Sequence, residues 1–476
     1  MIPESGIQFF GKQNAETITW NMFRFHGNET CSKAGPAARA SRGEAGARAG
    51  PRWKDRQGCR SKAREDVGHM ARSGRSFVGY QRTHYRRLRP LGLAASAAVI
   101  GVRGIEVSQC IQDLDNSVPL IADKTTVVRL YLDPATLGKA GSVTAELAWS
   151  RGGAEAYLPA LNAVRLDPAK NEDIHAQRSD LEKSVNFRLP AEAIGAGTLR
   201  LRLSRVFAPG GSDLPVGAPN TVDVDFVSAP PLRIRVIGLR YRAGGKPVAP
   251  DAIHFNYFRS YLGRAYPVAS LEWSQIVVDA DFGSPFNAST VDLANAQIAA
   301  LRGREVTHGV DQRTHYFGLV DDNGGLSGYF MRGKAYAIPS SKPQPDTVAS
   351  GPCGTPRGLA GDRDLSYADW YGAHELGHTF GRYHPGFPPY DPATKAGQDA
   401  SDPAFPYAGG FISTPDGRYV GLDTGDPDLP APMMALPGLG YHDVMTYADN
   451  QWLSAYTYMA ILERLIAEDA LGPAIS

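Results

Sequence analysis

The chain has 476 residues, of which 42% are hydrophobic and 21% charged, with four cysteines and a formal net charge of +1. This is the composition of an ordinary globular protein with room for two or three domains, and it excludes a small protein built on a disulfide framework. No apolar run reaches the roughly 18–20 residues that a helix needs to cross a bilayer, so no transmembrane segment is expected.

Residues 1–100 are expected to form a disordered basic leader. Residues 33–89 hold 16 Lys and Arg against 4 Asp and Glu, while residues 90–476 carry a net charge of −10. The basic segment is rich in Gly, Ala, Ser and Arg and lacks hydrophobic periodicity. Arginine clusters attract phosphate, but no aromatic residues are interleaved as a stacking surface, so no nucleic-acid partner is expected. A solvated leader, or translated sequence upstream of the true start, fits better.

The end of this leader has two interpretations. The apolar run 91–98 follows an arginine-rich stretch and either enters the first strand or forms a short export signal after Met70. Its shortness favours the strand. The four cysteines (Cys31, Cys59, Cys110 and Cys353) are too scattered for a disulfide framework, and Cys353 is expected to be an ordinary loop cysteine.

Residues 101–228 alternate apolar and polar side chains with a period of two. Gly, Pro and Asp separate these segments, as turns separate strands. The pattern predicts an antiparallel β-sandwich with a structural or adhesive role. A proline-containing linker, 228–231, then precedes a domain at 232–470. The alternating apolar positions include Val143, Ala145, Leu147, Trp149, Val185, Phe187, Leu189, Leu199, Leu201, Leu203, Val222, Val224 and Phe226.

Strands and helices alternate in the first half of the second domain. An edge strand there can pair with an extended peptide and present its scissile bond. The histidines at 254, 308 and 315 lack metal-ligand spacing and are expected to be structural. The expected strands are 232–240, 271–278, 315–320 and an edge strand at 333–338, and the expected helices are 252–262 and 293–301.

A further helix is expected from near Ser366 to Gly381. Ser366 and Asp369 have the spacing of a capping box, with Asp in the position that Glu usually takes. Gly381 allows the chain to leave the helix through a backbone conformation that other residues resist.

This helix carries the most informative residues of the chain. His374 and His378 lie four residues apart, so both imidazoles project from one face. His384, three residues after Gly381, can return as a third nitrogen ligand, and Glu375 lies beside the metal that they hold. Three protein ligands with one open position are typical of a catalytic zinc, which predicts a zinc hydrolase.

The segment 385–442 contains 11 prolines and is expected to form a loop that walls a substrate cleft. Its aspartates make Ca²⁺ an alternative second ion beside the expected Zn²⁺. A methionine turn follows at Met445, with Tyr447 two residues later. His442 is expected to be a turn residue or a hydrogen-bond donor to a ligand, and 452–466 a helix packed into the core.

The run His374-Glu375-x-x-His378-x-x-Gly381-x-x-His384, followed by Met445-x-Tyr447, resembles the signature of the metzincin metallopeptidases. The Met-x-Tyr form is similar to that of astacin-, serralysin- and pappalysin-like enzymes. The resemblance implies that Met445 packs beneath the metal without binding it, and that Tyr447 is a fifth metal ligand or stabilises the oxyanion.

Three shorter fragments resemble secreted bacterial metzincins with an immunoglobulin-like domain before the peptidase. The resemblance extends over about 102–468 and implies an immunoglobulin-like β-sandwich followed by an α+β metzincin-like peptidase domain. It also implies a secreted or cell-envelope zinc endopeptidase that acts on protein or peptide substrates, with Glu375 and Tyr447 catalytic, and we expect a monomer. An adhesin with a vestigial metal site is the alternative. The fragments are Arg264–Pro267, Ala349–Pro352 and Gln451–Ser454.

Overall fold

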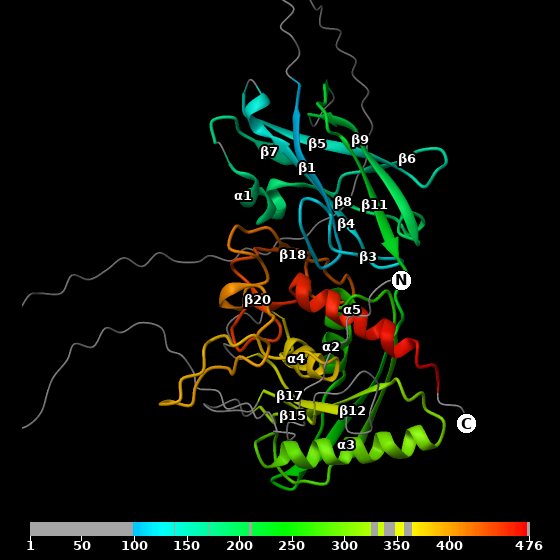
Figure 1. Cartoon of the computed structure of the whole chain (residues 1–476), viewed down its shortest axis with the longest axis vertical. Coiled ribbons are helices and arrows are strands. Elements are labelled where there is room, and N and C mark those ends of the chain that lie inside the picture. The colour runs from blue at the N-terminus through cyan, green and yellow to red at the C-terminus, as the bar shows by residue number, and fades with distance from the viewer. Residues whose placement is uncertain are drawn as a thin grey trace, which may run out of the picture. The chain divides into compact units, whose positions relative to one another are not determined.

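The computed structural model describes residues 99–473 except 138, 171, 209–211, 325–331, 338–347 and 357–363, and these described residues fall within one compact unit. The predicted basic leader up to residue 98, with Cys31, Cys59 and the apolar run 91–98, lies outside them. The described chain is a mostly-β multidomain fold with few helices (Figure 1). None of the described helices is long and apolar enough to cross a membrane.

Two sheets form the first region of the fold. One has the strand order β1 (Gly101–Ser108), β4 (Val127–Asp133), β8 (Val185–Arg188) and is antiparallel. The other has the order β3 (Leu120–Ile121), β11 (Thr221–Val227), β9 (Gly197–Phe207), β5 (Gly141–Ser150), β6 (Ala156–Pro159), with β7 (Val164–Leu166) and β10 (Asp213–Leu214) paired to β5 and β9. Short helices connect these strands: η1 (Pro134–Thr136), α1 (Ile174–Arg178), η2 (Leu181–Lys183) and η3 (Ala191–Ala193).

The predicted alternation in this region is confirmed. Leu199, Leu201 and Leu203 of β9 are fully buried, whereas Arg200 between them is exposed. Residues of both sheets contribute to a single hydrophobic core. Strand β9 therefore removes the apolar side chains of one face from water while its other face stays solvated, whereas β4 of the smaller sheet is buried on both faces.

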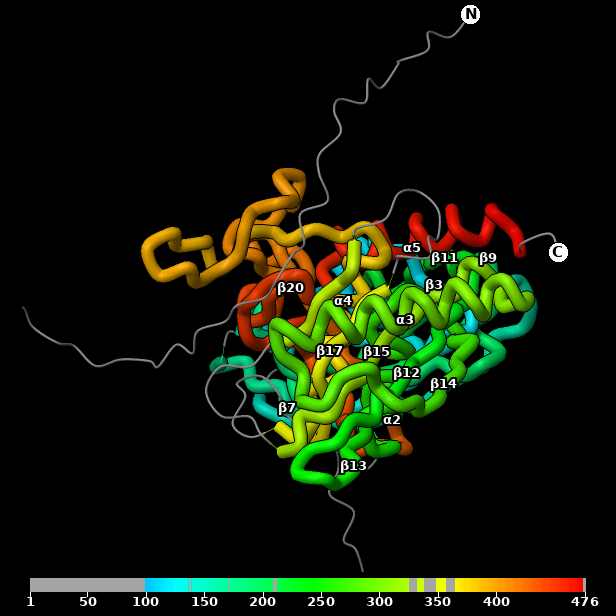
Figure 2. Tube along the Cα trace, turned by 90° about the horizontal axis from the view of Figure 1, so that it is seen from below, coloured from blue at the N-terminus to red at the C-terminus, as the bar shows by residue number. Residues whose placement is uncertain are grey.

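The second region is built on a mixed sheet. Strands β14 (Leu271–Asp279), β12 (Leu232–Ala243), β15 (His315–Asp321) and β17 (Val348–Cys353) run parallel, and β13 (Lys246–Val248) and β16 (Lys334–Ala335) pair antiparallel to β12 and β17. Helices α2 (Ala252–Ala265) and α4 (Ala368–Thr379) pack on one face and α3 (Thr290–Thr307) on the other. Figure 1 shows this layering, and Figure 2 shows α3 in front of β12 and β15.

The two faces of β12 show why this sheet needs helices on both sides. Leu232, Ile234 and Val236 join the core under α2 and α4, and Ile237 and Leu239 join the core under α3. The apolar residues of β12 therefore serve both faces of the sheet, although arginines such as Arg233 and Arg235 interrupt the apolar run.

The remaining elements lie in the last quarter of the chain. They are η4 (Ala408–Gly410), β18 (Val420–Asp423), β19 (Met434–Leu436), β20 (His442–Asp443), β21 (Gln451–Trp452) and α5 (Ala455–Asp469). Apart from these short pieces the segment 385–442 is irregular, as predicted. Strand β18 also pairs with β2 (Ile111–Gln112), so the first and second regions share a small sheet.

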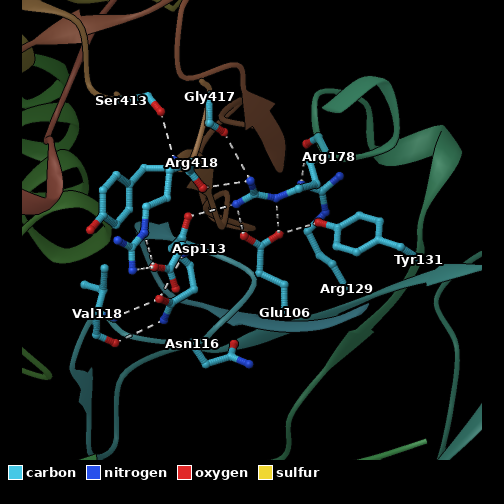
Figure 3. Close-up of polar contacts among 12 residues, drawn as sticks. Glu106, Asp113, Asn116, Val118, Arg129, Tyr131, Arg178, Ser413, Gly417 and Arg418 are labelled. Atoms are coloured by element: carbon cyan, nitrogen blue, oxygen red, sulfur yellow. Dashed lines mark hydrogen bonds and ion pairs between the residues drawn. The ribbon is translucent and has the colours of Figure 1, made fainter. Parts of the chain in front are cut away.

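Buried polar contacts strengthen this junction (Figure 3). Arg178 forms an ion pair with Glu106 at 2.5 Å and donates to the carbonyl oxygen of Arg418 at 2.8 Å. The Arg418 side chain in turn bonds Asp113 at 2.8 Å. Trp452 donates its indole N–H to the Cys110 carbonyl oxygen at 3.0 Å. The first region therefore braces the loop and the turn that follow α4.

Most predicted elements of the second region are present, but three predictions were wrong. The helix that carries His374 and His378 begins at Ala368, and its N-cap residue is Tyr367, which makes no side-chain cap bond, instead of Ser366. The last helix begins at Ala455, where Ser454 supplies the cap. Cys353 lies in strand β17 and not in a loop. The predicted edge strand at 333–338 is β16, and its last residue lies outside the described chain.

Candidate metal centre

Helix α4 presents the signature residues inside the fold, and all twelve of its residues are buried. It ends in a tight turn in which Gly381 has a φ of 79°. There Gly381 N donates to the His378 carbonyl oxygen at 2.9 Å, and Arg382 N donates to that of Gly377 at 3.0 Å. This pair of bonds is a Schellman motif, which only a left-handed residue can close. The turn brings His384 back toward the helix, as the sequence predicted.

The three imidazoles of His374, His378 and His384 meet at one point. Their ligand nitrogens all lie within 4.8 Å of one another, and Nε2 of His378 is 3.1 Å from Nε2 of His384. Four-coordinate zinc holds nitrogens at about 2.0–2.1 Å, which places them roughly 3.3 Å apart. The donor set and its spacing therefore fit Zn²⁺.

Each imidazole is oriented through its other nitrogen. The Nδ1 atoms of His374 and His378 face the carbonyl oxygens of Val444 and Arg382, each at 2.7 Å. Nδ1 of His384 faces Asp399 Oδ1 at 2.7 Å. These acceptors select the tautomer with hydrogen on Nδ1 and direct Nε2 toward the shared point.

Electrostatics keep His374 and His378 neutral. Burial, followed by the neighbouring imidazoles, lowers the pKa of His374 well below its usual value, and burial with His384 lowers the pKa of His378 to about 3. A neutral imidazole is the form that binds a metal ion.

Glu375 lies between α4 and the edge strand β16. Burial raises the pKa of Glu375 well above its usual value, and the backbone of Ala335 in β16 hydrogen-bonds the carboxylate. Its Oε2 atom is buried and has no hydrogen-bond partner among the described residues. A carboxyl group in this setting can accept a proton and hold it.

The predicted methionine turn lies beneath α4. Met445 is 1% exposed, and its sulfur packs against Gly377. Asp443 shapes the turn by accepting from Met445 N at 2.9 Å and from Ser454 N at 3.0 Å. Met445 is thus a packing residue, and no contact suggests that it is a ligand.

Tyr447 follows the turn and lies beside the imidazoles. Its ring centroid is 5.0 Å from that of His384 and 6.0 Å from that of His374. Burial and then the charge of Glu375 raise the pKa of Tyr447 well above its usual value. The structure therefore brings together all five predicted site residues.

Two neighbours of the site were not predicted. Asp399 comes from the proline-rich loop, where nothing in its local sequence distinguishes it from other aspartates. Arg332 precedes β16 and lies over the rings of Tyr371 and Trp370, at 4.8 Å and 5.8 Å from their centroids. Its charge lowers the pKa of His374. Only the fold places these side chains at the site.

The other histidines expected to be structural have varied surroundings. His442 is stacked against Phe387 and Phe411, with centroid distances of 5.0 Å and 4.6 Å. His315 bonds Thr379 and Glu468 at 2.9 Å and 2.8 Å. Each is satisfied away from the metal centre. His308 Nδ1 faces the Arg304 carbonyl oxygen at the end of α3, and His254 belongs to a second cluster.

Among the described residues, two groups of three side chains could hold a metal ion, and the aspartates of 385–442 contribute to neither. One is the histidine triad, and the other comprises His254, Asp321 and Cys353.

Comparison with protein-family models, with curated proteins and with solved structures found no match for this chain. The functional argument therefore depends on the side chains and their geometry.

Proposed function

We propose that this chain is a zinc-dependent endopeptidase of the metzincin type, preceded by an immunoglobulin-like β-sandwich, that hydrolyses peptide bonds of protein or peptide substrates. One observation carries the proposal: three buried imidazoles converge through Nε2 while their Nδ1 atoms are held by Val444, Arg382 and Asp399. A merely structural group of histidines needs no such common orientation.

His374, His378 and His384 would hold the ion, and a bound Zn²⁺ supplies Lewis-acid activation of water and of the scissile carbonyl. Glu375 accepts the proton of the attacking water and later delivers it to the leaving amine. Its burial and raised pKa suit a carboxyl group that holds this proton between the two steps.

Tyr447 acts on the developing oxyanion. Its raised pKa favours the neutral phenol, which donates a hydrogen bond through Oη. A donor aimed at charge that appears only in the transition state accelerates the reaction without tightening substrate binding. We therefore assign Tyr447 to oxyanion stabilisation in preference to metal ligation.

The substrate would bind as an extended chain along β16. This strand pairs with β17 on one side and is an edge of the sheet among the described strands. The carboxylate of Glu375 packs against Gly333, the residue directly before this strand. A peptide that adds to this edge by backbone hydrogen bonds places a scissile bond beside the proposed base.

A casein assay of the purified chain with and without chelator, beside Glu375→Ala, tests this proposal. We expect chelation to abolish cleavage, and Glu375→Ala to keep its zinc while losing nearly all turnover. Undiminished cleavage by Glu375→Ala would show that Glu375 is not the general base.

The same assay tests the alternative, an adhesin with a vestigial site. Such a protein would retain zinc but cleave nothing in either form. Secretion and a monomeric state remain expectations; size-exclusion chromatography and fractionation of the source cells measure them.

A further inference from the structure

A second group of metal-type ligands lies on the same side of the sheet as α2. Asp321 and Cys353 end the parallel strands β15 and β17 and are direct partners in the strand register. His254 lies in the first turn of α2. The ligand atoms of these three side chains lie within 4.8 Å of one another, and His254 Nε2 is 3.9 Å from Asp321 Oδ2.

The facing atoms of this group are not hydrogen-bonded among the described residues. The bonds that orient the side chains use other atoms: His254 Nδ1 bonds Ser366 Oγ at 2.8 Å, and Asp321 Oδ1 accepts from Asn323 N at 2.7 Å. The thiol of Cys353 is fully buried and unoxidised. The three facing atoms can therefore act as ligands to one shared ion.

The charge around the group also calls for a cation. The negative charges of Asp322 and Asp251 act on both Cys353 and Asp321. Within the described chain none of these three aspartates forms an ion pair with Lys or Arg; the only basic group near them is His254. Negative charge gathered around the fully buried thiol of Cys353 is costly to that group unless a cation balances it.

We propose that His254, Asp321 and Cys353 form a second metal site, distinct from the histidine triad, that binds a divalent transition-metal ion of the Zn²⁺ class. Thiolate and imidazole ligands select such ions over Ca²⁺ and Mg²⁺, which prefer oxygen. Tetrahedral zinc places nitrogen, oxygen and sulfur ligands roughly 3.3–3.8 Å apart, so the present spacing needs only small side-chain movements.

Binding balances the local charge. The Cys353 thiol releases its proton to solvent as the ion binds, so a thiolate, a carboxylate and a neutral imidazole surround the divalent ion with no net charge. A water molecule completes four-coordination.

The site would join α2 to the strand ends and, through one more bond, to the start of α4. Ser366 Oγ, which bonds His254, also accepts from Ala368 N, the first residue of α4, at 3.3 Å. The role is structural, and it does not depend on peptidase activity.

Cobalt substitution of the full-length chain tests the proposal. The triad offers only nitrogen, so a near-ultraviolet sulfur-to-cobalt charge-transfer band cannot come from it, and loss of the band in Cys353→Ser assigns it to the second site. We expect this band in the wild-type chain and in Cys110→Ser, which removes the other buried free cysteine, and its loss in Cys353→Ser. No band in the wild type, or a band that persists in Cys353→Ser, overturns the proposal.

Metal content gives an independent measurement. We expect Asp321→Asn and Cys353→Ser, with circular dichroism unchanged, to bind one zinc ion fewer per chain than the wild type. An unchanged zinc content overturns the proposal. If Cys353→Ser does not fold, the zinc content of Asp321→Asn and the cobalt spectrum of the wild type still test the proposal. If the histidine triad binds no metal, the sulfur-to-cobalt band is still expected. The two proposed metal sites can therefore be refuted independently.

Discussion

Gly333 lies directly against the side chain of Glu375. A methyl group on Gly333 would lie 2.3 Å from Glu375 Cγ and 2.6 Å from Oε1. The proposed base is therefore packed against the backbone just before β16, where there is no room for a side chain.

Gly333→Ala is expected to lower kcat by about 10²-fold while zinc content stays unchanged, because displacing the base by about 1 Å misaligns the proton transfer. Steady-state kinetics with metal analysis measures both. Gly303→Ala is the matched control, since nothing lies within 4 Å of its added methyl group. Full activity of Gly333→Ala would show that Glu375 is free to shift.

Tyr447→Phe is expected to lower kcat by about 10²-fold and to change zinc affinity only slightly, because it removes a donor to the oxyanion. Tyr458→Phe is the control, since that buried hydroxyl has no hydrogen-bond partner in the described chain. Zinc titration and kinetics on both variants separate the two roles. A fall in zinc affinity as large as the fall in kcat would instead make Tyr447 a ligand.

Asp399→Asn is expected to weaken zinc binding by about 10–100-fold, because the carboxylate orients His384. The hydrogen bond to His384 lowers the pKa of Asp399, so this carboxylate is ionised at neutral pH. Competition with a chelating dye measures the affinity. Asp428→Asn, in the same loop and exposed, should bind zinc as the wild type does. Equal affinities in the two variants would contradict the orienting role.

Gly377→Ala is expected to destabilise the fold by about 1–3 kcal/mol, although alanine favours helix over glycine. The new methyl group would lie 2.5 Å from the sulfur of buried Met445. Urea unfolding measures the change. Combined with Met445→Ala, the substitution should cost much less than it does alone, because the crowding is gone. If the two changes in unfolding free energy simply added, the methyl group at position 377 would not be in steric conflict with Met445.

Because Lys124 is buried, the stability of the folded chain is expected to depend on pH. Burial lowers the pKa of Lys124 from 10.5 to about 8. Between these values the unfolded chain binds more protons than the folded one, so stability rises with pH. Below pH 8 the full penalty of about 3 kcal/mol is present. The stability of the wild type relative to Lys124→Met should therefore increase from pH 8 to pH 10. A constant difference would mean that Lys124 keeps its usual pKa.

The elements with strong periodicity could be predicted from the sequence. The alternation of Leu199, Leu201 and Leu203 and the apolar residues of β12 and β15 predicted strands correctly, because burial follows the period of the side chains. The predicted strand β14 is also present, although none of its residues is buried. β17 was not predicted, and its Gly351 and Pro352 are residues that local propensity disfavours in strands. It is a strand because it lies inside the sheet, where pairing to β15 outweighs local propensity.

The start of α4 was misjudged for a similar reason. Ser366 and Asp369 have the spacing of a capping box, but the N-cap residue is Tyr367, and Ser366 Oγ bonds both Ala368 N and His254 Nδ1 of α2, a residue 112 positions away. Local spacing cannot show that a distant side chain shares the same hydroxyl.

The sequence by itself determined the triad, since His374, His378, Gly381 and His384 are local and helix geometry with one left-handed turn brings their imidazoles together. The tertiary structure decided what surrounds it: Gly333 and Ala335 against the base, Asp399 behind His384, and Arg332 over the aromatic rings of α4. It alone also brought His254, Asp321 and Cys353 together. These contacts join segments far apart in the chain, and only packing of the sheet, helices and loop determines which of them meet.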